Sequence, residues 1–295
     1  MNADSAFQIG AAHAVCQDYS LAGAVLPTAL PQGGATPQQE GRPYVILSDG
    51  CSSSPDTDIG ARLLVKAAEQ TLLGRGSGGS ATTLDPAEIH REAARLALTW
   101  AKLLGLPPQA VDATLLSAHL VGDELVVGCS GDGVICLQTW AGAVEVYSIS
   151  YASGYPLYPA YTHQPARLLA LKQAGHSGKE VARFRSASIE ERLQPSGTSG
   201  GDSLTEVFTV RAANYRYVAL FSDGIHSFFN AGLNGSGGNR GEAIALDEPL
   251  RSLISFKSTR GAFVGRRLKM FLKDCRNRGW QHLDDLAFGA LHLGG

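Results

Sequence analysis

The sequence predicts an α+β fold in which mainly antiparallel β-sheets are covered by helices on their outer faces. Three observations support this prediction. Strand-like segments follow one another across short turns, segments of helical periodicity come in two pairs, and no Rossmann or P-loop glycine motif joins a strand to a helix. With 295 residues and 44% apolar content, the chain is long enough to bury a substantial core.

Charge and composition limit the classes of partner. A formal net charge of −2 gives no reason to expect a nucleic-acid partner. The first residues show no signal-peptide pattern and no apolar run is long enough to cross a bilayer, so we expect a cytoplasmic protein without a membrane partner. The cysteines are odd in number, widely spaced and without a zinc-finger pattern, which predicts a reduced set: Cys16, Cys51, Cys129, Cys136 and Cys275.

The N-terminal part should form a β-hairpin followed by two helices. Residue patterns predict strands over 15–26 and 44–50, joined by a loop over 27–43 that is rich in Pro, Gly and Gln. Asp58 is placed to cap a first helix, because the apolar residues after it recur at helical spacing. A second helix is predicted over 86–104, with Asp85 as its N-cap.

The remaining chain returns to strands. Four short strands over 113–149, separated by short turns, predict an antiparallel meander. The stretch 151–203 is rich in Tyr and Pro and is predicted to be irregular apart from one helix. The other expected elements are that helix at 165–174, a loop at 195–203, strands at 205–212 and 215–224, helices near 248–256 and 265–277, and a last strand at 284–293.

Acidic side chains stand where the predicted strands end. The stretches YVILSDG and YVALFSDG close two distant strands with the same dipeptide, at Asp49 and Asp223. One Asp-Gly pair is ordinary turn chemistry, but its repetition at several strand ends indicates a shared acidic site. Carboxylate and carbonyl oxygens of this kind suit a hard cation such as Mg²⁺ or Mn²⁺. The acidic residues at strand ends or turns are Asp18, Asp49, Asp132, Asp223, Asp284 and Asp285.

An ordered series of motifs resembles the metal-dependent type-2C (PPM family) serine/threonine protein phosphatases, in their bacterial stand-alone form. The series is CQDYS, VILSDG, DATLL, GCSGDGV, ALFSDGI and DDLAFGAL, and it covers nearly the whole chain. The resemblance implies a single domain over 1–295, built as a four-layer αββα sandwich of two antiparallel sheets flanked by helices. It also implies a flap-like insertion at about 151–204 beside the active site.

The same resemblance implies a site for two Mn²⁺ or Mg²⁺ ions at one end of the sandwich. Asp49 matches the carboxylate that bridges the two metals, and Gly50 matches the residue whose carbonyl reaches one of them. Asp223 and Asp284 match ligands of the other metal. Asp18 matches an acidic residue that supports the site from behind or through water.

Several positions extend this pattern or depart from it. Asp132 matches an Asp tied to a third, weaker metal, but Ser227 stands where a further Asp for that metal is often found. His13 lies at the spacing of a phosphate-binding Arg; it is either a catalytic phosphate-binding residue or a structural histidine. Gln17 replaces a metal-linked Glu, and Cys51 replaces a His that protonates the leaving group in some members.

The activity that the resemblance implies is hydrolysis of phosphoserine and phosphothreonine in proteins, by direct attack of a metal-bridging hydroxide. Its partner would be a phosphorylated protein substrate, and the enzyme would oppose a serine/threonine kinase. Two other functions stay open. One is a phosphatase-like binding or regulatory module with weak turnover, and the other is a hydrolase of small phosphate esters on the same fold.

Overall fold

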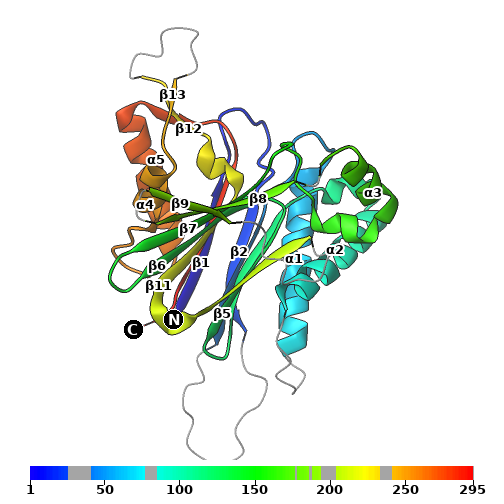
Figure 1. Cartoon of the computed structure of the whole chain (residues 1–295), viewed down its shortest axis with the longest axis horizontal. Helices are drawn as coiled ribbons and strands as arrows, with labels where there is room; N and C mark the ends of the chain where they lie inside the picture. The colour runs from blue at the N-terminus through cyan, green and yellow to red at the C-terminus, as the bar shows by residue number, and fades with distance from the viewer. Residues whose placement is uncertain are drawn as a thin grey trace, which may run out of the picture.

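Two antiparallel β-sheets lie face to face in a computed structural model of the chain (Figure 1). The structure describes residues 1–25, 41–76, 85–176, 178–185, 188–193, 204–232 and 241–294. Most of the loop expected at 27–43, and all of the loop expected at 195–203, lie outside these residues.

The two sheets differ in size and share no strand. The larger runs in the order β1 (Asn2–Gln8), β15 (Leu286–His292), β11 (Tyr215–Phe221), β6 (Gly133–Thr139), β7 (Val144–Tyr151), β8 (Lys179–Arg185) and β9 (Ser188–Leu193). The smaller runs in the order β10 (Thr205–Arg211), β5 (Glu124–Ser130), β4 (Leu115–Val121), β3 (Arg42–Ser48) and β2 (Tyr19–Val25). A small third sheet joins β13 (Glu242–Ala243), β12 (Phe228–Asn230) and β14 (Trp280–His282).

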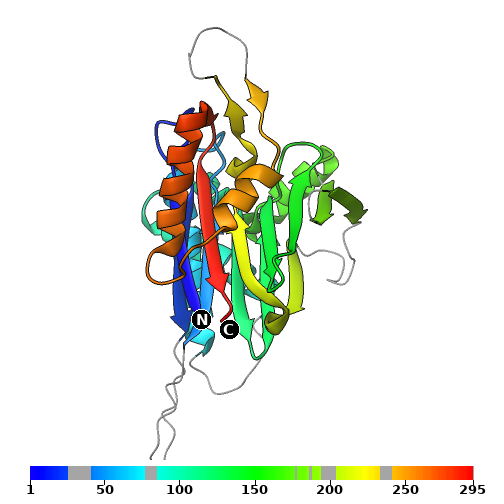
Figure 2. The ribbon, with the colours of Figure 1, turned by 90° about the vertical axis from the view of Figure 1, so that its left-hand side faces the viewer.

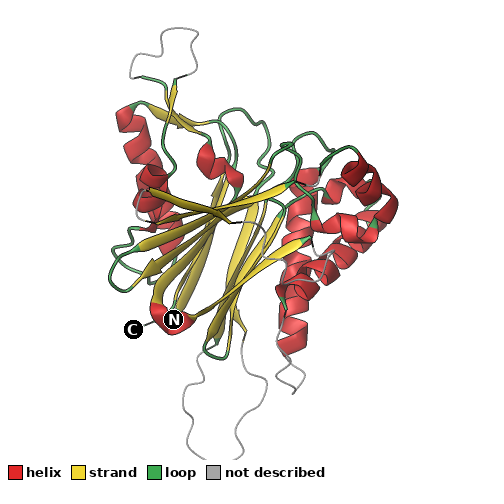
Figure 3. Ribbon diagram, in the orientation of Figure 1, coloured by secondary structure: helices red, strands yellow, loops and turns green. Residues whose placement is uncertain are grey.

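Helices cover the outer faces of both large sheets, as Figure 3 shows. The five-stranded sheet carries α1 (Thr57–Gly76) and α2 (Pro86–Leu103), and the seven-stranded sheet carries α4 (Asp247–Ile254) and α5 (Phe263–Arg278). A shorter helix, α3 (Pro165–Gln173), lies near α2. The described 3₁₀ turns are η1 (Pro108–Val111), η2 (Pro159–His163), η3 (Ala212–Asn214) and η4 (Asp223–His226).

Three apolar clusters hold the four layers together. The central cluster combines residues of both sheets, such as Leu47 and Leu116 from one and Leu220 and Leu291 from the other. A second cluster joins α1 and α2 to the five-stranded sheet, and a third joins α4 and α5 to the seven-stranded sheet. Burial of these apolar side chains is the main favourable term for the fold. The predicted αββα sandwich is therefore confirmed.

Several local predictions are confirmed. Strands β2 and β3 form the expected antiparallel hairpin, with Tyr19 opposite Ser48, although β2 begins at Tyr19 and not at residue 15. Helix α2 begins after Asp85, whose side chain accepts a hydrogen bond from the backbone N–H of Ala87. The helices expected near 165–174, 248–256 and 265–277 are α3, α4 and α5.

The predicted meander over 113–149 is wrong. Strands β4 and β5 pair within the five-stranded sheet, but β6 and β7 pair within the seven-stranded sheet, so the chain crosses between sheets after Ser130. The crossing uses Gly131 and Gly133, both with positive φ (89° and 144°), which favours glycine. A short turn in the sequence looks the same whether it joins paired strands or two sheets.

Other elements differ from the sequence prediction. Strand β1 was not predicted, and it pairs along its whole length with β15. Helix α1 begins at Thr57, so Asp58 lies within its first turn and is not its N-cap. The stretch predicted to be irregular over 151–203 contains β8 and β9, which extend the seven-stranded sheet beyond β7. No helix in the described ranges combines the length and apolar character needed to cross a membrane.

Candidate active site

Three strand ends place three carboxylates in one pocket. Asp49 follows β3 of the five-stranded sheet, Asp223 follows β11 of the seven-stranded sheet, and Asp284 precedes β15, the neighbour of β11. All three line a pocket of about 200 Å³. Its other lining residues are His13, Gly50, Cys51, Ser52, Ser53, Thr114, Asp132, Gly154, Tyr155, Pro156 and Tyr158. The structure therefore brings Asp49 and Asp223, which the repeated Asp-Gly endings singled out, together with Asp284.

Close backbone packing explains the glycine after each strand. A Cβ added at Gly50 would lie 2.7 Å from the carbonyl oxygen of Thr57, and one added at Gly224 would lie 1.7 Å from that of Asp285. Neither separation is sterically allowed without movement of the backbone. The backbone of Asp49 is also fixed, because its N–H donates to Thr114 Oγ1 (3.0 Å) and its carbonyl accepts from the Thr114 N–H (2.8 Å). The strand end thus holds the carboxylate in a defined direction.

Asp18 lies behind the pocket and does not line it. Its side chain is fully buried, and Ser222 Oγ donates to its Oδ2 at 2.6 Å. The Asp18 carboxyl group is also within hydrogen-bonding reach of Asp49. Asp18 therefore lies behind the carboxylates that line the pocket, and its supporting role stays a prediction.

Burial and mutual repulsion oppose ionisation of these carboxyl groups. Desolvation raises the pKa of Asp49 well above its ordinary value, and the charges of Asp18 and Asp223 raise it further. Burial likewise raises the pKa of Asp18 and of Asp132 to about 7, with a further contribution from the charge of Asp223. The pKa of Asp284 is also raised, mainly by desolvation. Such a cluster at neutral pH requires protons or cations to offset its charge.

Two buried oxygens show how the cluster would accept a cation. Asp18 Oδ1 and Asp223 Oδ1 are buried and have no hydrogen-bond donor among the described residues. An acceptor left without a donor in the interior is costly, and a divalent cation bound by oxygen ligands removes that cost. The donor set therefore fits Mg²⁺ or Mn²⁺. Within the described residues, however, no three His, Cys, Asp or Glu side chains are already grouped as a metal-binding set.

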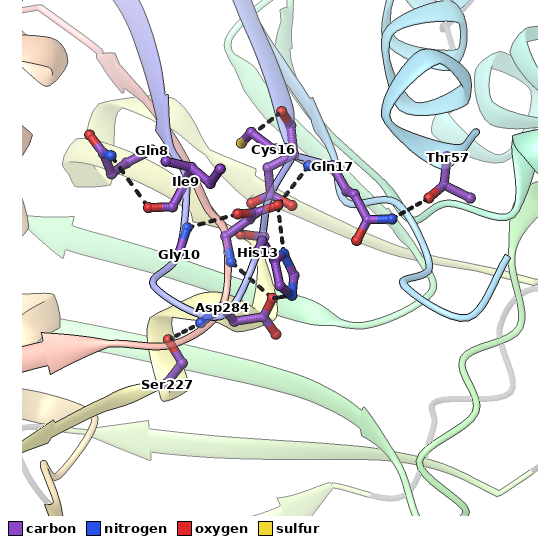
Figure 4. Close-up of polar contacts among 12 residues, drawn as sticks. Gln8, Ile9, Gly10, His13, Cys16, Gln17, Thr57, Ser227 and Asp284 are labelled. Atoms are coloured by element: carbon purple, nitrogen blue, oxygen red, sulfur yellow. Dashed lines mark hydrogen bonds and ion pairs between the residues drawn. The ribbon is translucent and has the colours of Figure 1, made fainter. Parts of the chain in front are cut away.

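His13 lines this pocket, with its ring beside Asp284 (Figure 4). Its Nδ1 lies 2.9 Å from Asp285 Oδ2, and its Nε2 lies 3.4 Å from Asp284 Oδ1. Burial alone would lower the pKa of the imidazole, but the hydrogen bond to Asp285 and the nearby negative charges outweigh burial and raise it. The shift increases the protonated fraction of His13 at a given pH, and the protonated ring can donate to a phosphate oxygen.

Asp285 is the residue that sequence reasoning left without a role. It is buried, and its two carboxyl oxygens accept hydrogen bonds from the backbone N–H groups of Gly10 (2.8 Å) and Gln17 (2.6 Å). It therefore fixes the loop between β1 and β2 and orients His13 at the same time. The Asp-Asp pair before the last strand was its only signal in the sequence.

A family model for protein phosphatase 2C matches residues 32–272 of the chain. The chain belongs to the protein phosphatase 2C family. The enzyme class expected from the sequence, a protein serine/threonine phosphatase, follows from this membership. The family depends on Mn²⁺ or Mg²⁺. No curated protein matches the chain by sequence.

Solved structures of bacterial phosphatases share the fold. The serine/threonine phosphatase Stp1 from Staphylococcus aureus superposes with a TM-score of 0.55 at 12% identity, covering 100% of this chain and 96% of that one. The Mycobacterium tuberculosis serine/threonine phosphatase PstP/Ppp gives a TM-score of 0.51 at 14% identity, with coverages of 100% and 99%. The S. agalactiae serine/threonine phosphatase gives 0.52 at 13% identity, with coverages of 99% and 99%. At such low identity these likenesses show the fold alone.

Two of the positions that depart from the protein phosphatase 2C pattern, Gln17 and Ser227, have structural roles in this chain. Gln17 Nε2 donates to Thr57 Oγ1 (2.8 Å), and Thr57 Oγ1 donates to the carbonyl of Cys51 (3.0 Å). Gln17 therefore braces the loop after Gly50 and does not line the pocket. Ser227 Oγ donates to the Gly224 carbonyl (2.8 Å) and accepts from the Asp284 N–H (3.2 Å), so it positions the Asp284 backbone.

Cys51 lines the pocket beside Gly50. Burial would raise the pKa of its thiol, but hydrogen bonds with Ser53 and Tyr158 lower it overall. Two histidines near the predicted ligands lie outside the pocket lining, namely His226 beside Ser148 and His282, whose Nε2 is 3.1 Å from the Ile9 carbonyl.

The stretch 151–204 supplies one wall of the pocket, through Tyr155 and Tyr158. It is tied to the core by Arg167 of α3, which donates to both carboxyl oxygens of Asp112 (2.7 and 2.6 Å). The carbonyl of Asp112 in turn accepts from the N–H of Cys51 (2.9 Å). The pocket wall and the loop after Gly50 are therefore held to one another.

Proposed function

We propose that this protein phosphatase 2C family member hydrolyses phosphoserine and phosphothreonine in phosphorylated proteins, in the cytoplasm and in opposition to a serine/threonine kinase. The observation that carries the proposal is the convergence of Asp49, Asp223 and Asp284, from strand ends of both sheets, on one pocket. Carboxylates that converge on one pocket are the arrangement that binds hard catalytic cations.

The chain's own residues would hold two cations, Mn²⁺ or Mg²⁺. The proposed ligands are Asp49, the carbonyl of Gly50, Asp223 and Asp284, with Asp18 as support behind them and Asp132 for a weaker third ion. Bound there, the cations would supply a water nucleophile of lowered pKa and neutralise the charge of the phosphoryl oxygens. Because residue 227 is a serine, whose hydroxyl is used in hydrogen bonds to backbone groups, this third site would have one carboxylate fewer than the family pattern.

His13 would bind the substrate phosphate. Asp285 lies 2.9 Å from Nδ1 and would keep the ring in place, which leaves Nε2, 3.4 Å from Asp284 Oδ1, as the nitrogen that would donate to a phosphate oxygen. Tyr155, which is exposed and lines the same pocket, would contact the peptide, so the segment 151–204 would shape substrate choice. We propose that this segment is a flap-like insertion in a single domain over 1–295.

The test is hydrolysis of a phosphothreonine peptide by the purified chain with Mn²⁺. We expect turnover that Asp49→Ala and Asp223→Ala abolish, while Asp123→Ala, on the exposed β4–β5 turn, leaves the rate unchanged. Equal rates in the wild type and both pocket variants would reject the site.

A weakly active binding module is the second candidate, favoured by the absence of the usual Arg, His and Asp at His13, Cys51 and Ser227. Calorimetry separates the two functions: tight uptake of two metal ions with turnover supports the enzyme, whereas phosphopeptide binding without turnover supports the module. A hydrolase of small phosphate esters would cleave an aryl phosphate and leave the phosphopeptide intact.

A further inference from the structure

Positive charge is concentrated in one short part of the chain. Residues 251–278 contain nine Lys and Arg residues and one acidic residue, Asp274. The whole chain has a formal net charge of −2, so this stretch carries +8 and all other residues together carry −10. A segregation of this size creates a strong local field on an otherwise acidic protein.

Helix α5 presents most of this charge on the outer face of the molecule. Its apolar residues Phe263, Leu268 and Phe271 are buried against the seven-stranded sheet. Figure 2 shows α5 along the outside of that sheet, with no described element over it. The exposed cations on α5 and the segment before it are Arg251, Lys257, Arg260, Arg266, Lys269, Lys273, Arg276 and Arg278.

Few of these cations are neutralised within the protein. Arg251 pairs with Asp247, and Arg278 pairs with Glu248. Lys257, Lys269 and Lys273 form no ion pair with any residue that the structure describes. Ion pairing inside the chain therefore does not account for the concentration of basic residues.

The surface also contains an apolar groove between these charges. A cavity of about 320 Å³ is lined by Phe256, Phe263 and Met270, with Lys257, Arg266 and Arg267 around it. The rings of Phe256 and Phe263 meet edge to face at 4.9 Å, which gives the groove a rigid aromatic wall. Met270 is 51% exposed, although it is a large apolar side chain. A groove of this size accommodates one apolar side chain.

We propose that this groove, with the basic face of α5, is a docking site for an acidic segment of a partner protein that inserts an apolar side chain beside Phe256. The exposed Lys and Arg residues are complementary in charge to an acidic segment. The rigid apolar groove between them would hold one apolar side chain of that segment. A membrane surface fits less well, because the apolar residues of α5 face inward and Met270 alone offers exposed apolar area on the helix. The site is independent of the acidic pocket.

The probe is a fluorescently labelled peptide of Asp and Glu residues around a central Leu, whose binding to the full chain is followed by anisotropy. We expect Lys257→Glu with Arg266→Glu to weaken binding about tenfold, because both attractive charges become repulsive. The matched control, Arg91→Glu with Lys102→Glu on exposed positions of α2, makes the same change in net charge and should alter binding less than about twofold.

A second comparison tests the groove itself. Met270→Ser should weaken binding of the peptide with the central Leu about fivefold. Binding of a second peptide, in which Ser replaces this Leu, should stay unchanged. Hydrolysis of a small aryl phosphate should be the same in all variants. Equal losses in the α2 control, binding of phosphatidylserine vesicles without binding of the peptide, or self-association through this face would each overturn the proposal.

Discussion

The ends of β3 and β11 have almost the same sequence but different surroundings. In both, a Ser-Asp-Gly sequence sends the Asp into the pocket, and the Gly packs against a backbone carbonyl. At β3, Ser48 Oγ donates to the carbonyl of Thr114. At β11, Ser222 Oγ donates to Asp18 and accepts from the N–H of Ala287. The motif therefore directs an Asp carboxylate into the pocket at both strand ends. The number of buried hydrogen bonds that depend on its serine differs between the two ends.

Replacing each carboxylate by an amide gives the largest expected effect. It compares the contribution of the carboxylate to turnover with its contribution to the free energy of unfolding. Asp49→Asn and Asp223→Asn should each reduce Mn²⁺-dependent turnover by about a hundredfold to a thousandfold, at least the loss seen when groups that merely orient a metal ligand are removed. In metal-free protein at neutral pH, Asp49→Asn should raise the free energy of unfolding by about 1 kcal/mol, because folding of the wild type must either protonate the buried Asp49 carboxyl or keep its charge beside Asp18 and Asp223.

Initial rates and urea unfolding, both with Asp123→Asn as the control, measure these two quantities. If Asp49→Asn lost activity and stability together, the carboxylate would be a structural group and not one held at a cost for function.

Substitution of the glycines after the two strands, Gly50 and Gly224, gives the next largest expected effect, a difference in the free energy of unfolding. Gly224→Ala should cost about 3 kcal/mol, because its new methyl group would lie 1.7 Å from the carbonyl of Asp285 and the backbone beside His13 would have to move. Gly50→Ala should cost about 1 kcal/mol, since the nearest atom, the carbonyl oxygen of Thr57, is 2.7 Å away. Denaturant midpoints measure both losses, and equal values would show that the two strand ends are equally adaptable.

Sequence patterns located most of the elements because each pattern is local. The hairpin β2–β3, the capped helix α2 and the final strand all have residue signals of their own. The crossing between β5 and β6 had none, since Gly131 and Gly133 would serve a hairpin equally well. Strand β1 was missed because pairing with β15, and not its own composition, makes it a strand.

The site was predictable to a similar extent. Repeated Asp-Gly endings identified Asp49 and Asp223, and the structure brings them into one pocket with Asp284. Asp285 was not assigned a role, because its hydrogen bonds reach Gly10 and Gln17, more than 260 positions away in the chain. Tyr155 and Tyr158 lie in a stretch without a motif, and only folding places them beside Cys51 and Gly50. Binding of cations by these residues stays a prediction.

Substitution of the serines that precede the two aspartates, Ser48 and Ser222, gives the smallest expected difference in the free energy of unfolding. Ser222→Ala should lower the free energy of unfolding by about 2 kcal/mol, because it leaves a buried oxygen of Asp18 and the N–H of Ala287 without partners. Ser48→Ala removes only a donor to the Thr114 carbonyl and should cost about 1 kcal/mol. Urea unfolding of metal-free protein measures both. A larger loss at Ser48 would mean that the β3 end, and not the β11 end, holds the carboxylate cluster in place.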